Sequence, residues 1–219
     1  MSANRERERK LAAGAAAALA EDGMTVGLGT GSTAGDFLRA LAARTLNLRC
    51  VATSPTTERV ALELGLQVEP FEGLDAVPRL DLAVDGADQI ARDRWVVKGG
   101  GGAHTREKVV AAAASRFVVI GSSDKLVDRI RQPVPLELLR YGLRATLERL
   151  SHADVRDAPP TPDGGILADW RGAVEDPAAL AILLDRTPGV VEHGLFPPDL
   201  VSDVLVGRGE TVERISRTP

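Results

Sequence analysis

The chain has 219 residues, of which 44% are hydrophobic and only 3% aromatic, and its formal net charge is -4. This composition excludes wholesale disorder and predicts an aliphatic core in one large domain, or in one domain with a smaller partner. The acidic balance argues against a nucleic-acid binder. The sequence contains no run of 18 apolar residues, so no membrane span is expected. Cys50 is the only cysteine, which excludes an internal disulfide and indicates a cytoplasmic protein, while three scattered histidines give no metal-ligand spacing.

The first 130 residues alternate between strand and helix patterns. Strands are predicted at 25–28, 49–52, 66–68, 82–84, 95–97 and 117–120. Helices are predicted at 4–22 with Gly23 as the stop, from the glycine loop to about 44, from Pro55 to Gly65, and at 105–115. Short apolar runs between helices are typical of buried parallel strands. The alternation therefore predicts a doubly wound, Rossmann-like α/β domain with a mostly parallel sheet.

The amino-acid composition changes near residue 131, where prolines and arginines become more frequent. The predicted order is a strand at 134–138, a helix at 141–150, two short strands flanking 159–165, a helix from Pro177 and a strand near Val190. A βαββαβ order favours a small α+β domain of ferredoxin-like type. The tail, 201–215, is predicted to form a hairpin that returns to the first sheet. We therefore expect a catalytic domain at 1–130 plus about 200–219, and a smaller domain at 131–199.

A glycine-rich loop follows the first strand, with the sequence Gly29-Thr-Gly-Ser-Thr-Ala34. Backbone amides and a helix N-terminus at such a loop can bind an anion. The spacing also fits a dinucleotide fingerprint, but the next strand ends in Thr53-Ser54, without the acid that binds a ribose hydroxyl. A single phosphate is the favoured ligand, and a glycine turn without any ligand is the alternative.

The central stretch places charged side chains at the ends of strands. Asp85 and Asp88 follow one apolar run, and Lys98 with four glycines follows the next. Glu107 lies in the first turn of the helix after them, and Lys125 follows the strand at 117–120. Only four of the 27 basic residues are lysines, so a lysine in these positions suggests a site rather than generic charge.

A carboxylate beside an ammonium and a bare backbone loop is suited to moving a proton next to a carbonyl group. A positioned base contributes roughly 10²–10⁴-fold in rate, and each preorganised donor to the resulting oxyanion contributes on the order of 3 kcal/mol. Proton transfer between the carbonyl carbon of an aldose and its neighbour, through an enediolate, needs such a base and such donors and no cofactor. As alternatives, Glu107 could be a dipole-stabilised helix residue, and the two aspartates could be turn formers.

Several of these segments together resemble the type A family of ribose-5-phosphate isomerases. The matching segments are Gly29–Ala34, Asp85-Gly-Ala-Asp88, Lys98–Ala103, Thr105–Lys108, Lys125 and Pro188–Phe196. The resemblance implies interconversion of ribose 5-phosphate and ribulose 5-phosphate without metal or nucleotide, by a homodimer or a tetramer.

The resemblance also implies roles for individual residues. Glu107 would be the base that carries the proton, Lys98 would stabilise the enediolate oxygen with the loop amides, and Asp85 would assist ring opening. The implied substrate-binding residues are Lys10, Thr30, Gly31, Ser32, Thr33, Asp85, Gly86, Ala87, Asp88, Lys98, Gly99, Gly100, Gly101 and Lys125. Which loop takes the phosphate is left open, and Lys108 is expected to be structural.

Two positions depart from the family pattern. Gln89 stands where the family usually has glutamate, with a modest expected effect, and Thr161–Gly165 replaces the family's Asp-Asn-Gly-Asn turn. Two other classes of function remain in view. A non-enzymatic phosphosugar sensor on the same scaffold would not need Glu107, and a nucleotide-dependent oxidoreductase or an acyl-CoA transferase would require an added cofactor.

Overall fold

The computed structural model describes residues 2–216, so Met1 and 217–219 of the predicted first domain lie outside the described residues. The chain divides into two units. Within residues 2–216, unit 1 comprises the chain up to 87, 106–126 and the chain from 199 onward, and unit 2 comprises 88–105 and 127–198. The segment 88–105, which the sequence assigns to the first domain, groups here with 127–198.

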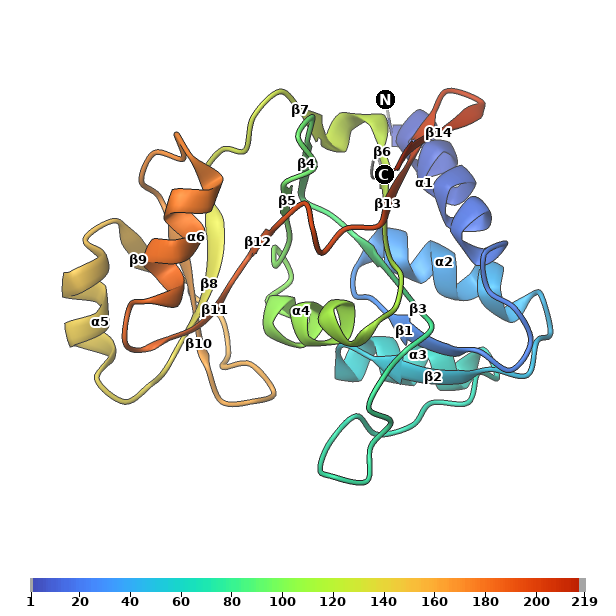
Figure 1. Ribbon diagram of the computed structural model, residues 1–219, viewed down its shortest axis with the longest axis horizontal. Helices are drawn as coiled ribbons and strands as arrows, with labels where there is room; N and C mark the ends of the chain where they lie inside the picture. The colour runs from blue at the N-terminus through green and yellow to red at the C-terminus, as the bar shows by residue number, and fades with distance from the viewer. Residues whose placement is uncertain (1, 217–219) are drawn as a thin grey trace. The chain divides into compact units, whose positions relative to one another are not determined.

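Unit 1 is organised around a six-stranded sheet with the order β14-β13-β6-β3-β1-β2 (Figure 1). Its strands are β1 (Thr25–Leu28), β2 (Arg49–Ala52), β3 (Leu82–Gly86), β6 (Phe117–Ser122), β13 (Asp203–Arg208) and β14 (Thr211–Ser216). The neighbours from β13 to β2 are parallel, and only the edge strand β14 is antiparallel to its partner within this sheet. The predicted α/β fold with a mostly parallel sheet is confirmed, as is the return of the C-terminal hairpin to that sheet.

Helices cover both faces of this sheet. The helices of unit 1 are α1 (Ser2–Ala17), α2 (Ser32–Ala42), α3 (Pro55–Glu63) and the greater part of α4 (His104–Ala113). Side chains of α1, α2 and α3 share one buried aliphatic cluster with Val26, Leu82 and Val118. Successive strand residues point to opposite faces, so Gly27 faces the other side, where a Cβ would lie 2.4 Å from Val110 of α4.

Two details of unit 1 differ from the prediction. Helix α1 ends at Ala17 rather than near Gly23, because Arg44 donates from its guanidinium to the carbonyl oxygens of Ala17 and Ala20. A helix end needs such donors for its last carbonyls. The strand expected at 66–68 is reduced to an isolated parallel bridge between Cys50 and Val68.

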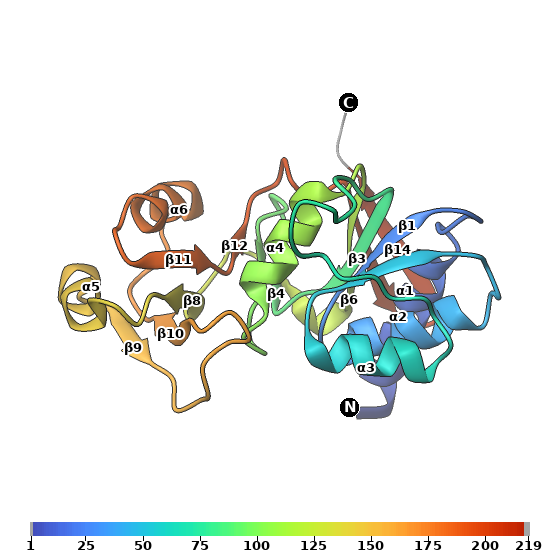
Figure 2. The ribbon, with the colours of Figure 1, turned by 90° about the horizontal axis from the view of Figure 1, so that it is seen from below.

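Unit 2 contains a four-stranded antiparallel sheet with the order β11-β8-β10-β9 (Figures 1 and 2). Its elements in chain order are β8 (Val134–Leu138), α5 (Leu143–Leu150), β9 (Ala153–Val155), β10 (Ile166–Trp170), α6 (Pro177–Asp185) and β11 (Val190–His193). The predicted element order is therefore confirmed. Leu136, Leu184 and Trp170 belong to its buried core.

A second sheet in this part of the chain corrects one prediction. It has the order β12-β5-β4-β7 and contains β4 (Gln89–Ala91), β5 (Val96–Val97), β12 (Leu195–Phe196) and β7 (Leu126–Val127). The run at 95–97 was expected to be a parallel strand of the main sheet, but β5 is antiparallel to both β4 and β12. Across residues 2–216, no helix is both long enough and apolar enough to cross a membrane.

Candidate active site

The glycine loop after β1 carries a cluster of hydroxyl groups in unit 1. Thr30 Oγ1 lies 2.8 Å from Thr53 Oγ1, 2.9 Å from Ser54 Oγ and 3.0 Å from Thr57 Oγ1. Ser54 also caps α3, since its hydroxyl accepts from the Thr57 amide. The prediction included Thr30 but missed its three partners, although the hydroxyl-rich junction of β2 and α3 was visible in the sequence.

Asp85 is fixed against the same loop. Its Oδ1 accepts from the amide of Thr30 at 3.1 Å and from the amide of Gly86 at 2.7 Å, and the residue is 3% exposed. A Cβ on Gly29 would lie 2.1 Å from the Asp85 carboxyl carbon, so only glycine fits there. The structure therefore brings the predicted loop and the predicted aspartate together. Gly86 is close to Thr33 of α2, because a Cβ at Gly86 would lie 3.4 Å from Thr33 Cβ.

Helix geometry puts Glu107 on the sheet-facing side of α4, near the level of Asp85. The C-terminal end of α4 is bonded to the segment just before β3, where the amide of Leu80 donates to the carbonyl of Ala113 at 2.9 Å. Val110 touches Gly27, which pairs with Ala83 in the middle of β3. Glu107 lies three residues before Val110 on the same face of α4, which is about 4.5 Å of helix rise. Because a strand rises about 3.3 Å per residue, this distance spans between one and two residues of β3 beyond Ala83.

This helix geometry puts Glu107 at the carboxyl ends of the strands, on the face that Asp85 shares with Ala83 two residues earlier. Glu107 is 4% exposed and stands in the first turn of its helix, where the dipole favours a negative charge. Unit 1 thus gathers two buried carboxylates and the glycine loop at one edge of its sheet. Ligands bind at this edge in open α/β sheets.

Unit 2 contains the other predicted polar groups. Asp88 Oδ2 accepts from the Gly100 amide at 2.7 Å, which joins the second aspartate to the four-glycine loop. Lys98 is 3% exposed, its amide donates to the Gly194 carbonyl, and its Nζ lies 5.7 Å from the centroid of the Phe196 ring. A buried ammonium of this kind is an electrostatic group held in a defined position rather than a solvated surface charge.

The loop amides are not all available as oxyanion donors, contrary to the simplest expectation. The Gly100 amide is committed to Asp88, and the Gly102 amide donates to the Gly99 carbonyl at 3.0 Å. The Gly99 and Gly101 amides are the remaining candidates in the described part of this loop. The loop also has a partner that the sequence did not reveal, Arg156, which donates to the carbonyl oxygens of Gly99 and Gly100.

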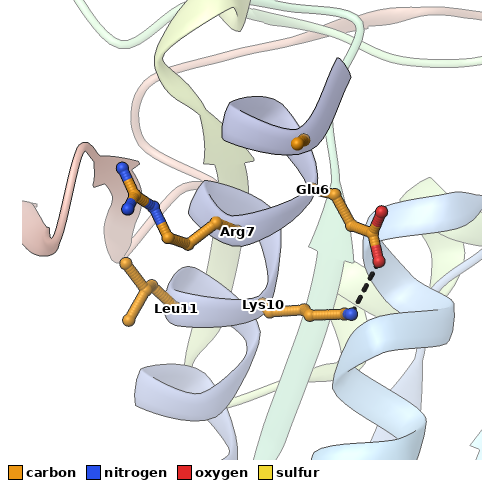
Figure 3. A pocket seen from close by; sticks show the side chains of 5 residues that line it. Glu6, Arg7, Lys10 and Leu11 are labelled. Atoms are coloured by element: carbon orange, nitrogen blue, oxygen red, sulfur yellow. Dashed lines mark hydrogen bonds and ion pairs between the residues drawn. The ribbon is translucent and has the colours of Figure 1, made fainter. Parts of the chain in front are cut away.

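The two outlying lysines are placed differently from each other. Lys10 is exposed on α1 and forms an ion pair with Glu6, 2.6 Å from Nζ to Oε1, beside a hollow of about 520 Å³ lined by α1 residues (Figure 3). Arg7 and Leu11 extend from the other side of the same helix (Figure 3). Lys125 is half-buried at the end of a short 3-10 helix after β6, and it forms no ion pair with any residue in 2–216.

One group of side chains within 2–216 has ligand atoms spaced for a cation. Asp185, Glu192 and His193 offer atoms that lie within 4.8 Å of one another. The His193 ring is already engaged, because Nδ1 accepts from the Leu195 amide at 3.2 Å and Nε2 lies 3.1 Å from Asp185 Oδ1. With Nδ1 as acceptor, Nε2 carries the proton and donates to Asp185. His193 and Asp185 are therefore a hydrogen-bonded pair, and neither ring nitrogen of His193 is available to a cation in this arrangement.

Comparison with known proteins decides the family. Residues 49–211 match the family described as ribose 5-phosphate isomerase A (phosphoriboisomerase A). The chain is 43% identical to a ribose-5-phosphate isomerase A of Caulobacter vibrioides, over 95% of this chain and 97% of that protein. The chain belongs to the ribose 5-phosphate isomerase A family. It is accordingly an isomerase, and a relative from Roseiflexus castenholzii, 44% identical over 94% of each chain, carries the same name.

Solved structures of the family agree with this assignment. A ribose 5-phosphate isomerase A from Methanocaldococcus jannaschii superimposes with a TM-score of 0.88 at 31% identity, covering 95% of this chain and 98% of that one. A D-ribose-5-phosphate isomerase in complex with phospho-erythronic acid superimposes with a TM-score of 0.90 at 33% identity, covering 98% of this chain and 100% of that one. The family resemblance and the α/β architecture expected from the sequence are confirmed.

Gln89, where the family usually has glutamate, has a definite structural role. Its Nε2 donates to the Arg131 carbonyl at 2.7 Å, and its Oε1 accepts from the Arg131 amide at 2.8 Å. A glutamate could make only the second of these bonds, since a carboxylate has no proton to donate. In this member of the family the amide closes a two-way link between β4 and the segment before β8.

Proposed function

We propose that this chain interconverts D-ribose 5-phosphate and D-ribulose 5-phosphate through an enediolate, as a step of the non-oxidative pentose phosphate pathway. Membership of the isomerase family supports the reaction. The observation that supports the proposal is Glu107 itself, a buried carboxylate in the first turn of α4, which helix geometry puts near the level of Asp85. A sensor that only binds a phosphosugar would not need a base there.

In the proposed reaction, Asp85 assists opening of the sugar ring and Glu107 removes the proton from C2. The electrons of that C–H bond form the C1–C2 double bond, and the carbonyl oxygen at C1 becomes the enediolate oxygen. Lys98 and a loop amide stabilise this charge, and each such preorganised donor contributes on the order of 3 kcal/mol. Glu107 then returns its proton to C1, the C2 hydroxyl loses its proton as its oxygen becomes the ketone, and the oxygen at C1 gains a proton and becomes a hydroxyl. The hydrogen balance closes within the substrate, so no metal, nucleotide or other cofactor is proposed.

The remaining residues are assigned to substrate binding. Asp88 is proposed to hold sugar hydroxyls, and its bond to Gly100 supports a fixed orientation for it. The loop Thr30–Thr33 presents hydroxyls and an exposed helix N-terminus, which suits the hydroxyl or phosphate end of the substrate. Lys125 is proposed as a phosphate contact, and its lack of an ion pair within 2–216 supports this. Lys10 is retained as a second candidate, although its ammonium is engaged by Glu6.

Finer features of the predicted organisation belong to the same proposal. We propose that the main unit is Rossmann-like and that unit 2 includes a ferredoxin-like domain, which its βαββαβ order and antiparallel sheet support. We also propose that the chain is divided into a catalytic domain and a smaller domain. The enzyme is further proposed to be a cytoplasmic homodimer, or a tetramer, without nucleic-acid or membrane partners.

The direct test is an assay of ribose 5-phosphate conversion with purified protein, with and without a metal chelator and in the absence of nucleotides. The expected result is full activity under both conditions. An absolute requirement for an added metal or nucleotide would contradict the cofactor-free mechanism, and binding of ribose 5-phosphate without turnover would favour the sensor.

A further inference from the structure

The carbonyl side of the four-glycine loop is held by a single guanidinium group. Arg156 follows β9, and its Nη1 donates to the carbonyl oxygens of Gly99 and Gly100 at 2.9 and 3.2 Å. Its Nη2 donates to Asp169 Oδ1 on β10 at 2.6 Å. The Arg156 side chain is 18% exposed, so these bonds are shielded from most of the solvent. All of these groups belong to unit 2.

The orientation of two successive peptide groups follows from these contacts. In a trans peptide the C=O and N–H bonds point in opposite directions. Fixing the Gly99 carbonyl toward Arg156 therefore turns the Gly100 amide away from it, and that amide donates to Asp88 at 2.7 Å. Fixing the Gly100 carbonyl turns the Gly101 amide away from Arg156 in the same manner.

A glycine loop has no side chains of its own to hold it in one conformation. Gly99 has φ +99° and Gly102 has φ +78°, a region that other residues rarely adopt, so the conformation costs backbone entropy that must be offset by contacts. Leu167 of β10 supports the far end of the loop, where a Cβ on Gly102 would lie 2.5 Å from Leu167 Cδ1. Arg156 supplies the corresponding support for the Gly99 and Gly100 peptides.

We propose that Arg156, backed by Asp169, is a positioning residue of the isomerase: it sets the direction of the Gly101 amide and the orientation of Asp88 toward the substrate. This inference rests on the proposed function, because it assigns the loop amide to the enediolate oxygen and Asp88 to the sugar. In this proposal Arg156 itself contacts neither the enediolate oxygen nor the sugar. A lysine could not replace it, because one ammonium cannot reproduce a planar fork that joins two carbonyls to a carboxylate.

The test compares Arg156→Ala and Arg156→Lys with the control Arg171→Ala. Arg171 directly follows β10 and reaches Asp169 at 3.5 Å, but its side chain is 52% exposed, and within residues 2–216 it forms no bond to the glycine loop. Arg156→Ala is expected to lower kcat/KM about 10²-fold, mainly through kcat, since misplacement of a transition-state donor is felt in the chemical step. Arg156→Lys is expected to recover no more than about tenfold of this loss. Arg171→Ala is expected to keep wild-type kinetics.

Two further readouts separate positioning from general loss of structure. Added guanidinium chloride, at concentrations well below those that denature, is expected to raise the kcat of Arg156→Ala but not that of the wild type, with sodium chloride at matched concentration as the salt control. Amide hydrogen exchange at Gly100 is expected to accelerate in Arg156→Ala and to stay unchanged in Arg171→Ala.

The outcomes distinguish this inference from the proposed function. Wild-type kcat/KM and unchanged Gly100 exchange in a folded Arg156→Ala variant would overturn the inference while leaving the isomerase assignment intact. Equal losses in Arg156→Ala and Arg171→Ala would also overturn it, because the effect would then come from the sheet rather than from the loop. If the wild-type chain itself failed to isomerise the sugar, the proposed function would fall, and the exchange measurement would still decide whether Arg156 holds the loop.

Discussion

Glu8 of α1 provides a prediction about stability that can be worked out from its contacts. The residue is 2% exposed, and its carboxylate accepts from the Ser123 amide at 3.0 Å and hydroxyl at 2.7 Å, from the Gly209 amide at 2.9 Å and from Asn4 at 3.0 Å. The Gly209 bond, followed by those from Ser123, lowers the pKa of Glu8 from 4.5 to about 2. The carboxylate thereby joins the first helix to the end of β6 and to the C-terminal hairpin.

The sign and size of the effect follow from linkage. Because the folded-state pKa is below the unfolded value, Glu8 contributes stability that is fully present above pH 4.5 and is lost as the pH falls toward 2. A shift of this size corresponds to about 3 kcal/mol at neutral pH, at roughly 1.4 kcal/mol per pKa unit. Glu8→Gln is expected to remove this contribution at pH 7. At lower pH the difference in unfolding free energy between the variant and the wild type is expected to become progressively smaller.

The assay is urea-induced unfolding of the wild type and of Glu8→Gln at a series of pH values between 7 and 2.5. Glu21→Gln is the matched control, since it makes the same chemical change at an exposed position. The difference in unfolding free energy for Glu8→Gln is expected to fall with pH, while that of the control stays near zero. A difference that does not change with pH would show that the charge of Glu8 is not what stabilises this junction.

Three other substitutions or treatments test separate parts of the structure. Burial raises the pKa of the Cys50 thiol to about 12, so a thiol reagent at pH 8 is expected to react with the native protein on the order of 10²-fold more slowly than with the unfolded chain, and equal rates would refute the buried position. Gly29→Ala places a Cβ 2.1 Å from the Asp85 carboxyl carbon, so kcat/KM is expected to fall about 10²-fold in steady-state kinetics, and unchanged kinetics would argue against this close approach. Gln89→Glu removes the donor to the Arg131 carbonyl, and it is expected to lower the unfolding free energy by about 1 kcal/mol without changing kcat, as measured by urea unfolding and steady-state assays.

The parts of the fold that the sequence predicted are those set by local patterns. The apolar run that leads into Asp85 and the helix carrying Glu107 are each recognisable within about ten residues, because a buried strand and an acid in the first turn of a helix leave a local signature. The order of elements in unit 2 was predicted for the same reason. These local signals, together with the family motifs, are the basis for the predicted site residues.

The features that were missed depend on partners distant in sequence. The apolar run 95–97 contains no sign that β5 would pair antiparallel with β12, nearly a hundred residues later. The early end of α1 depends on Arg44, 27 residues beyond Ala17, and the glycine loop is held by Arg156, 57 residues beyond Gly99. Arginine is common in this chain, so no local pattern distinguished Arg156 from a solvated surface charge.

The measurement that tests the central claim most directly is the kinetics of Glu107→Gln with ribose 5-phosphate. Glutamine keeps the shape of the side chain and removes its ability to accept and return a proton. The account predicts that kcat falls by roughly 10²–10⁴-fold while the dissociation constant for ribose 5-phosphate stays near the wild-type value. A folded Glu107→Gln variant that isomerises the sugar at close to the wild-type rate would contradict it.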